Sequence, residues 1–280
     1  MMNKKVLIIS LVLIFTFLDN GYGEDKRLKV VSLAPSTTEI LFALDLNEEI
    51  VGVSSFCNYP LKVQEKEKIG TFSQPNIEKI LSLKPDIIFC TGLEQAPVIE
   101  KLKQLNLKVY VSDPSDIEEL FDSIREMAGL TNRDKEANEL INRMKIGIEE
   151  IKARTEVIPK EDRVKVFIEF WNDPLMSAGK GSFIDELITL AGGINISHDV
   201  KRPYSYFSPE QVIRRNPDCI ILAYMVNEDA AKAIKKRLGW EEIAAVKNNR
   251  IYNDIDPDIL LRPGPRLVKA LVELQKRLYP

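Results

Sequence analysis

Residues 133–154, with the sequence RDKEANELINRMKIGIEEIKAR, decide the fold that we predict for this chain. The stretch has no proline and one glycine, and its apolar residues recur at helical spacing, namely Leu140, Ile141, Met144, Ile148 and Ile151. It therefore predicts a single helix of roughly 20 residues, about 30 Å long at about 1.5 Å per residue. A helix of this length near the middle of the chain is placed to connect two lobes. The alternative is an ordinary surface helix within one domain.

Short apolar runs rich in β-branched residues alternate with helical patterns on both sides of this stretch. The runs that we predict as strands are residues 29–32, 50–53, 87–90, 109–112, 164–170, 219–223 and 250–252. Helical periodicity lies between them, for example at residues 37–44, 77–83 and 98–105. Such alternation favours βαβ units and parallel sheets. The predicted fold class is α/β, with two parallel-sheet lobes joined by one long backbone helix and a ligand cleft between the lobes.

An internal repeat also indicates two lobes. Residues 76–86, NIEKILSLKPD, and residues 208–218, SPEQVIRRNPD, each begin with a candidate helix N-cap and end in Pro-Asp before a predicted strand. Their glutamates, Glu78 and Glu210, lie 132 positions apart (210 − 78) on opposite sides of the long helix. We therefore predict the following division of the chain: an N-terminal α/β lobe over residues 24–132, a linking helix over 133–156 and a C-terminal α/β lobe over 157–280.

The first residues have the pattern of an export signal. Lys4 and Lys5 precede an almost unbroken apolar run over residues 6–18, and small residues follow at positions 21–23. This pattern predicts a signal peptide over residues 1–23 and a mature protein in the periplasm. An uncleaved N-terminal anchor is the alternative. Because no cysteine follows the apolar run, a lipid-anchored N-terminus is not indicated.

Composition excludes some classes of function. The net charge of −3 shows no basic footprint, so we expect no nucleic-acid partner. The three cysteines are an odd number and do not form a disulfide framework, although a Cys57–Cys90 bridge is left open. The single histidine, His198, has no cysteine or histidine near it at metal-ligand spacing. With no nucleophile elbow and no glycine-rich phosphate loop, the sequence predicts that the protein is not an enzyme.

The loops that follow the predicted strands carry an unusual set of side chains. Parallel α/β sheets bind ligands at the carboxyl ends of their strands, so these loops are expected to line the cleft. Aromatic side chains there supply large, stiff contact area. The candidate ligand-binding residues are Ser36, Phe56, Tyr59, Phe72, Thr91, Trp171, Met176, Tyr204 and Ser205. For any one of them, packing at the end of a lobe, or for Ser36 and Thr37 a helix cap, is the alternative.

Several motifs resemble one known family. They are residues 30–39 (VVSLAPSTTE), 52–54 (GVS), 59–60 (YP), the 76–86 repeat, 177–180 (SAGK) and 262–266 (RPGPR). In this combination the chain resembles periplasmic binding proteins of the helical-backbone type, over nearly all of its mature length. Members serve ABC importers of vitamin B12, haem and iron–siderophores, and the likeness is greatest to members that bind cobalamin. The resemblance implies two lobes joined by a rigid helix, with ligand held between lobes that move little.

The resemblance also assigns roles to residues. In cobalamin-binding members, aromatic side chains enclose the corrinoid. Their positions fall on Phe56 or Tyr59, on Phe72 and on Tyr204, and another falls near Thr91, where this chain has no aromatic residue.

Further contacts are implied by position in the later loops. Trp171 and Met176 lie in a loop that supplies another aromatic contact. Hydroxyl and backbone groups near Ser36, Thr91 and Ser205 are expected to orient the amide rim of the corrinoid.

The family docks one acidic residue of each lobe on arginines of the permease, and the matching positions are Glu78 and Glu210. Charge pairs of this kind give orientation and encounter rate more than affinity. Stabilisation of a helix N-terminus is the alternative role for both. The resulting prediction is a monomer that delivers a cobalamin-type ligand, a cobalt corrinoid, to an ABC permease in the inner membrane and needs no cofactor of its own.

Three other functions stay open. A receptor for iron–siderophores would call for a cationic cleft residue such as Arg202 or Arg262. A haem receptor would call for an axial ligand such as Tyr204, Tyr206 or His198. The alternative of another class is a secreted α/β enzyme, which would require a clustered acid–base pair.

Overall fold

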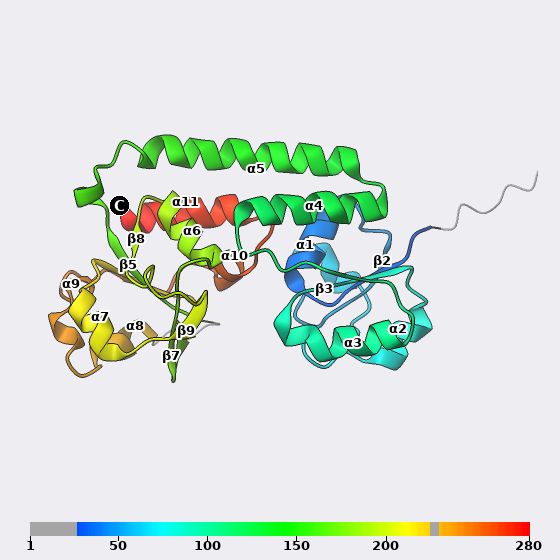
Figure 1. The fold of residues 1–280 in the computed structure, drawn as a ribbon, viewed down its shortest axis with the longest axis horizontal. Helices are drawn as coiled ribbons and strands as arrows, with labels where there is room; N and C mark the ends of the chain where they lie inside the picture. The colour runs from blue at the N-terminus through cyan, green and yellow to red at the C-terminus, as the bar shows by residue number, and fades with distance from the viewer. Residues whose placement is uncertain (1–26, 225–229) are drawn as a thin grey trace, which may run out of the picture.

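Two α/β lobes lie beneath one long helix in the computed structural model, which describes residues 27–224 and 230–280 (Figure 1). That helix, α5, spans Asp134–Thr155, and its 22 residues extend about 33 Å. The long helix predicted from residues 133–154 is therefore present and bridges the lobes. We propose residues 24–132 and 157–280 as the bounds of the lobes. The predicted signal peptide, residues 1–23, lies outside the described residues.

The N-terminal lobe is built around a four-stranded parallel sheet with the order β2-β1-β3-β4. Its strands are β1 Val30–Ser32, β2 Ile50–Val53, β3 Ile87–Cys90 and β4 Val109–Val111. Its helices are α1 Pro35–Ala43, α2 Ile77–Leu83, α3 Ala96–Gln104 and α4 Ile117–Thr131, with 3-10 turns η1 Leu61–Glu65 and η2 Leu93–Gln95.

The C-terminal lobe has a parallel sheet with the order β11-β10-β5-β8, made of β5 Lys165–Glu169, β8 Ile194–Asn195, β10 Cys219–Leu222 and β11 Ile251–Tyr252. A small antiparallel sheet adds β6 Trp171–Asn172, β7 Leu175–Ala178 and β9 Tyr204–Tyr206. The helices are α6 Phe183–Leu190, α7 Pro209–Arg215, α8 Ala230–Lys235, α9 Ala244–Lys247, α10 Pro257–Leu261 and α11 Leu267–Leu278, with 3-10 turns η3 Lys160–Asp162 and η4 Trp240–Glu242. The sequence did not predict the antiparallel sheet, whose strands have only two to four residues each.

The two parallel sheets share one topology. When β5 is matched to β1, β10 to β3 and β11 to β4, both sheets have the same order, with β8 in the place of β2. The Pro-Asp ends of the sequence repeat also make equal contacts. Asp86 and the backbone of Lys29 exchange hydrogen bonds of 2.8 and 2.9 Å, and Asp218 does the same with Lys165. The repeat in the sequence is thus a repeat of structure.

The repeated helices α2 and α7 begin and end alike. The side chains of Asn76 and Ser208 each accept a hydrogen bond from the backbone N–H three residues later, as predicted for N-caps. Both helices end at a residue in the left-handed conformation, Lys84 with φ 50° and Asn216 with φ 45°. A proline follows each of these residues and cannot continue a helix.

Alternate residues of the central strands enter different cores, because successive side chains of a strand point to opposite faces. In β1, Val30 enters a large core shared by both lobes, whereas Val31 enters a smaller core with residues of α2 and α3. In β5, Val166 and Ile168 enter the shared core and Phe167 enters an outer core of the C-terminal lobe. Both parallel sheets are therefore covered on both faces, as such sheets require.

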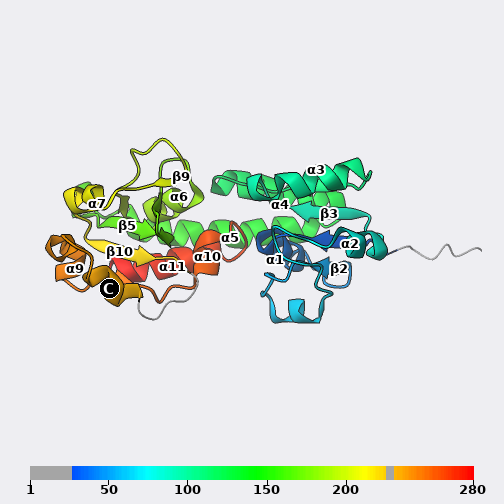
Figure 2. The ribbon, with the colours of Figure 1, turned by 90° about the horizontal axis from the view of Figure 1, so that it is seen from below.

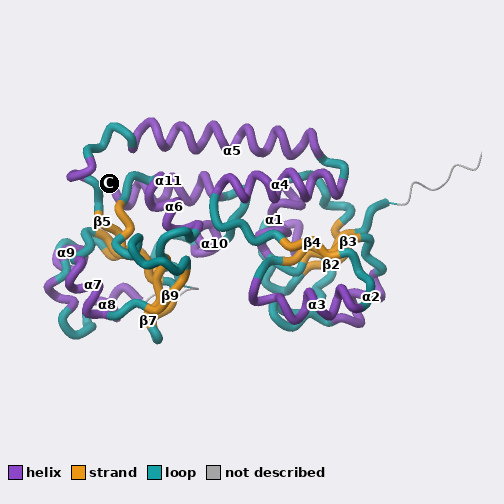
Figure 3. Tube along the Cα trace, viewed as in Figure 1, coloured by secondary structure: helices purple, strands orange, loops and turns teal. Residues whose placement is uncertain are grey.

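The shared core explains why the lobes hold together. Its residues come from helices of both lobes and from α5, for example Ile124 of α4, Ile148 of α5, Leu187 of α6 and Leu271 of α11. Helix α5 packs on α4 in one lobe and on α6 and α11 in the other. Figure 3 shows the strands of each lobe gathered beneath this helical layer. One continuous layer of apolar contacts thus spans the boundary between the lobes.

We predict that Gly147 is required for close packing of α5 on α11. A Cβ atom at Gly147 would lie 2.5 Å from Cγ1 of Val268, so Gly147→Ala should force the helices apart and destabilise the fold by about 1–3 kcal/mol. Gly129, near the end of α4, has no atom within 4 Å of its ideal Cβ, and Gly129→Ala should add up to about 1 kcal/mol of stability. Urea unfolding of both variants measures the difference. Equal effects of the two substitutions would contradict the packing described here.

Candidate ligand-binding site

The carboxyl ends of β1, β3 and β4 in the N-terminal lobe face a pocket of 510 Å³ between the lobes. The N-terminal lobe contributes loops that follow β1, β3 and β4, including Ser36, Thr91 and Asp113. The C-terminal lobe contributes residues around Tyr204 and Arg262. The volume lies within the range of about 300–1,000 Å³ that is usual for small-molecule sites. The predicted cleft between the lobes is therefore present.

A second depression, of 730 Å³, lies on the N-terminal lobe beside α3 and β4. It is more open than the interlobe pocket and shares Gly92 and Asp113 with it. We take the interlobe pocket as the candidate site, because both lobes contribute to it.

Four of the predicted ligand-binding residues line the interlobe pocket: Ser36, Phe72, Thr91 and Tyr204. They come from both lobes, with Phe72 and Tyr204 supplying an aromatic side chain from each. The structure brings these four together from positions that span 169 residues of sequence (204 − 36 + 1).

The other five predicted residues are not among those that line this pocket: Phe56, Tyr59, Trp171, Met176 and Ser205. Three of them lie in the antiparallel sheet, where Trp171 and Met176 are paired across β6 and β7, and Ser205 lies in β9. The Trp171 indole N–H donates to the backbone carbonyl of Asp173 at 2.8 Å, and 56% of this residue is exposed. Ligand contact by these five residues therefore stays a prediction.

Buried hydroxyl groups in the first turn of α1 hold the end of β1, next to Pro35 and Ser36 of the pocket lining. The hydroxyls of Thr37 and Thr38 donate to the carbonyl of Ala34, and Thr38 also donates to Ser32 Oγ at 2.7 Å. The prediction that Ser36 or Thr37 caps α1 was wrong. The N-cap position is Ala34, without a side-chain hydrogen bond, because Pro35 starts the helix and lacks an N–H group that needs a partner.

Gln95 holds three pocket segments in place, and the sequence did not reveal it. Its fully buried amide donates to the carbonyls of Leu33 at 3.0 Å and Phe72 at 2.8 Å, and it accepts from the N–H of Thr91 at 2.9 Å. These three backbone groups belong to different loops. One glutamine therefore sets the positions of two candidate ligand-binding residues, Phe72 and Thr91.

We predict that Gln95→Ala weakens both the fold and the pocket. The substitution leaves buried backbone groups of three loops without partners, which costs about 1–3 kcal/mol for each group that water cannot reach. The expected result is a free energy of unfolding lower by about 2–4 kcal/mol in urea denaturation. Gln64→Ala on exposed η1 is the matched control and should change stability by less than about 0.5 kcal/mol. A Gln95 variant as stable as the control would refute this role.

Three charged residues line the pocket among the described residues: Glu94, Asp113 and Arg262. The guanidinium of Arg262 is already engaged. It donates to Asn58 Oδ1 at 2.7 Å and to Glu39 Oε1 at 3.2 Å, and it pairs with Asp258 Oδ1 at 2.6 Å. Asp113 accepts a hydrogen bond of 3.5 Å from the hydroxyl of Thr91. The pocket therefore offers acidic groups as hydrogen-bond acceptors, whereas its cation is held by neighbouring side chains.

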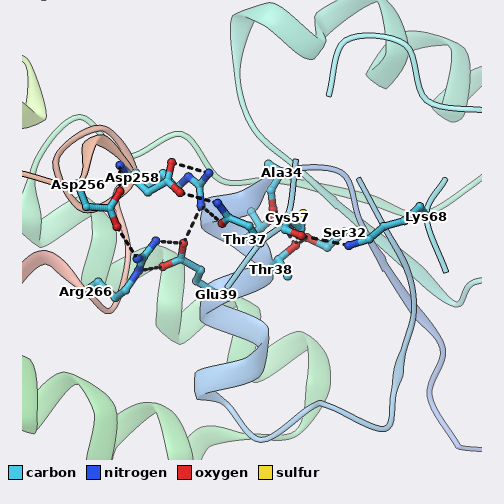
Figure 4. A network of polar contacts seen from close by, with 12 residues as sticks. Ser32, Ala34, Thr37, Thr38, Glu39, Cys57, Lys68, Asp256, Asp258 and Arg266 are labelled. Carbon is cyan, nitrogen blue, oxygen red and sulfur yellow. Dashed lines mark hydrogen bonds and ion pairs between the residues drawn. The ribbon is translucent and has the colours of Figure 1, made fainter. Parts of the chain in front are cut away.

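Two carboxylates tie the lobes together beside this pocket. Glu39 of α1 also accepts from Arg266 at 2.6 and 2.7 Å, which joins the N-terminal lobe to the segment between α10 and α11 (Figure 4). In the opposite direction, Glu186 of α6 accepts from the N–H of Ile117, the first residue of α4, at 2.9 Å. Burial raises the pKa of Glu186, against the lowering effect of that hydrogen bond. Seen from below, α10 lies beside α1 at the boundary between the lobes (Figure 2).

Tyr204 stands edge-on to another aromatic ring in the pocket wall. Its ring centroid lies 5.6 Å from that of Phe170, with planes at 86°. Burial of the phenol raises the pKa of Tyr204, and the Asp113 carboxylate raises it further. The tyrosine is thus a neutral aromatic surface with a hydroxyl group.

The histidine and the cysteines have structural surroundings. Nδ1 of His198 lies 2.8 Å from Oδ2 of Asp185, and the part of the chain that the structure describes has no group of three residues suited to a metal ion. All three cysteines are buried free thiols, so the Cys57–Cys90 bridge that the sequence left open is not formed. Burial raises the pKa of Cys90 and Cys219 to about 12.

Glu78 and Glu210 lie exposed in the first turns of α2 and α7. A hydrogen bond from its own backbone N–H, followed by one from Ser208, lowers the pKa of Glu210. Helices α2 and α7 lie on the side of the molecule away from α5, one in each lobe (Figure 1). Across the two described ranges, no helix is long and apolar enough to cross a membrane.

Two similar lobes, a shared core and a pocket lined from both sides are typical of a substrate-binding protein. The model of the family named Periplasmic binding protein matches residues 30–257, and the chain belongs to this family. It is an ABC-type periplasmic substrate-binding protein, in agreement with the resemblance noted from its motifs.

Individual relatives differ in what their names say they bind. The chain is 36% identical to the uncharacterized ABC transporter substrate-binding lipoprotein YvrC of Bacillus subtilis, with 94% of this chain and 85% of YvrC covered. The crystal structure of the periplasmic vitamin B12 binding protein BtuF of Vibrio cholerae matches with a TM-score of 0.76 and 28% identity, covering 89% and 96% of the two chains. The structure of S. aureus IsdE complexed with heme matches with a TM-score of 0.78 and 26% identity, covering 90% and 99%.

Proposed function

We propose that this protein captures cobalamin or a related corrinoid in the interlobe pocket and delivers it to an ABC permease. The observation that carries the proposal is a pocket with an aromatic side chain from each lobe, Phe72 and Tyr204, and with no cation free to pair with an anionic ligand among its described lining residues. The similarity to BtuF supports it.

The charges of the pocket favour an amide-rimmed ligand. The side-chain amides of a corrin ring donate hydrogen bonds, and the carboxylates of Glu94 and Asp113 are acceptors. The carboxylates of haem or of an anionic siderophore would instead meet like charges, which costs binding free energy. Hydroxyl groups of Ser36 and Thr91 can serve the same amide rim, as predicted from the sequence.

Haem is the second candidate ligand, because IsdE shares the fold and Tyr204 lies in the pocket. A tyrosine that ligates ferric iron does so as the phenolate. Burial and the Asp113 carboxylate raise the pKa of Tyr204, although 49% of this residue is exposed, so iron would have to displace the phenol proton. Ligand titration decides between the two ligands.

Ligand titration tests the proposal directly. Cyanocobalamin or dicyanocobinamide should quench the intrinsic fluorescence of the purified protein, and the Kd of either corrinoid should be below about 1 μM. Haemin and ferric siderophores should bind more weakly. Phe72→Ala and Tyr204→Ala should each weaken corrinoid binding about tenfold or more, because each removes aromatic contact area. Leu238→Ala is the control, since Leu238 is 95% exposed, does not line the pocket and is not a predicted ligand contact. Absence of corrinoid binding in this range would exclude the proposed ligand.

We also propose that Glu78 and Glu210 dock on cationic residues of the permease in the inner membrane. The support is their exposure at the same repeat position of the two lobes. The proposal also includes export to the periplasm by a signal peptide at residues 1–23, and function as a monomer. Each carboxylate would then meet one half of a two-fold permease.

The docking proposal predicts a loss of transport without a loss of ligand binding. Glu78→Lys and Glu210→Lys should each lower ligand uptake in a reconstituted importer about tenfold, because like charges would then face the permease. Glu150→Lys makes the same charge change on the exposed face of α5 and should leave uptake unchanged. Unchanged uptake in the Glu78/Glu210 double variant would reject docking through these carboxylates.

A further inference from the structure

Arg262 combines two properties that are rarely found together. It lines the candidate ligand pocket, yet only 14% of its side chain is exposed. Its guanidinium has three acceptors on two elements and a loop: Glu39 of α1, Asp258 of α10 and Asn58 of the loop after β2. Its hydrogen-bonding capacity is therefore largely used inside the protein.

Glu39 is the centre of this arrangement. It is 4% exposed, although it carries a charge, and such a group is stable only when it is paired. Arg266 approaches it through Nε at 2.7 Å and Nη2 at 2.6 Å, in the bidentate geometry that suits a carboxylate. Arg266 in turn lies over the ring of Tyr59, 4.3 Å from its centroid.

The charged side chains around Arg262 and Arg266 have a net negative charge. Three carboxylates, Glu39, Asp256 and Asp258, surround two guanidiniums, Arg262 and Arg266, which leaves one negative charge (2 − 3 = −1). Figure 4 shows Asp256 and Asp258 on the segment that faces Glu39. An anion entering the pocket would have to displace one of these partners from Arg262 before the arginine could bind it.

We infer that Glu39 and Asp258 determine the ligand specificity of this protein by withholding Arg262 from the ligand, so that the pocket rejects carboxylate-rimmed ligands. The inference rests on the proposed function, because it takes the interlobe pocket as the ligand site. Neither carboxylate is itself among the residues that line the pocket. They are positioning residues that act through Arg262.

The two carboxylates can be separated experimentally. Glu39 also ties the lobes together through Arg266, so Glu39→Gln changes both the charge on Arg262 and the contact between lobes. Asp258 lies four residues from Arg262 on the same segment, so Asp258→Asn relieves Arg262 and leaves the pairing of Glu39 with Arg266 in place.

Asp256 offers a matched control. It contacts Arg266 at 3.5 Å, and its side chain caps α10 by accepting from the N–H of Asp258. Asparagine caps a helix as well as aspartate does. Asp256→Asn therefore removes one negative charge from the same cluster without releasing Arg262.

The experiment titrates each variant with two corrins of opposite rim chemistry and with haemin. Dicyanocobinamide carries amides, whereas dicyano-cobyrinic acid carries carboxylates on the same ring. Glu39→Gln and Asp258→Asn should bind cobyrinic acid and haemin about tenfold more tightly than the wild type, because a charge-assisted hydrogen bond is gained. Asp256→Asn should show no gain. Adding Arg262→Gln to either variant should remove the gain.

The outcomes separate this inference from the proposed function. If no variant binds either corrin, the corrinoid proposal fails, and the haemin titration still tests Glu39 and Asp258. Correctly folded Asp258→Asn protein that gains no affinity for haemin or cobyrinic acid would overturn the inference. So would an equal gain in Asp256→Asn, or a gain that persists without Arg262. Thermal unfolding identifies folded variants, and Asp258→Asn decides alone if Glu39→Gln does not fold.

Discussion

A parallel sheet must be covered on both faces, and in this protein the helical layer over one face of each sheet is common to both lobes. Helix α5 packs on α4 at one end and on α6 and α11 at the other, and the buried residues beneath it form one continuous core. The lobes cannot rotate freely without breaking that core. The shape of the cleft therefore follows from apolar packing on the opposite side of the molecule.

Polar contacts complete what the shared core begins. Glu39 of the N-terminal lobe is held by arginines of the C-terminal lobe, and Glu186 of the C-terminal lobe accepts from the first N–H of α4. Each lobe thus supplies one carboxylate that accepts hydrogen bonds from the other lobe. A site whose walls are fixed in this way loses little entropy when ligand binds, which is the general advantage of preorganisation.

The same contacts determine the electrostatics of the pocket. An arginine in a pocket wall would ordinarily attract anions, but Arg262 is bound to three acceptors within the protein. Acidic Glu94 and Asp113 remain in the lining. In our proposal, structural stability and ligand choice depend on one network. The fold is shared by relatives that are named for different ligands, and it does not by itself determine specificity.

Local patterns were sufficient for much of the fold. The periodicity of residues 133–154 predicted α5 to within one residue at either end, and the repeat at Asn76 and Ser208 predicted equal caps and equal sheets. Strands such as β2 and β3 were predicted with their observed bounds, because buried apolar runs between turn residues are local features. The two to four-residue strands around Trp171 and Met176 carry too little periodicity to be recognised.

The candidate site was less accessible from the sequence. The ends of predicted strands pointed to Ser36 and Thr91, because the topology of parallel sheets places such positions at one edge. Phe72 and Tyr204 were predicted as aromatic residues of other loops and by resemblance, and Tyr204 lies in the antiparallel strand β9. The roles of Gln95 and Glu39 were not predictable. Glu39 meets its partner Arg266 across 227 positions, and Gln95 reaches Leu33 across 62. Hydrogen bonds between residues so distant leave no periodic pattern in the sequence, so only the packing of the lobes decides which buried polar groups meet.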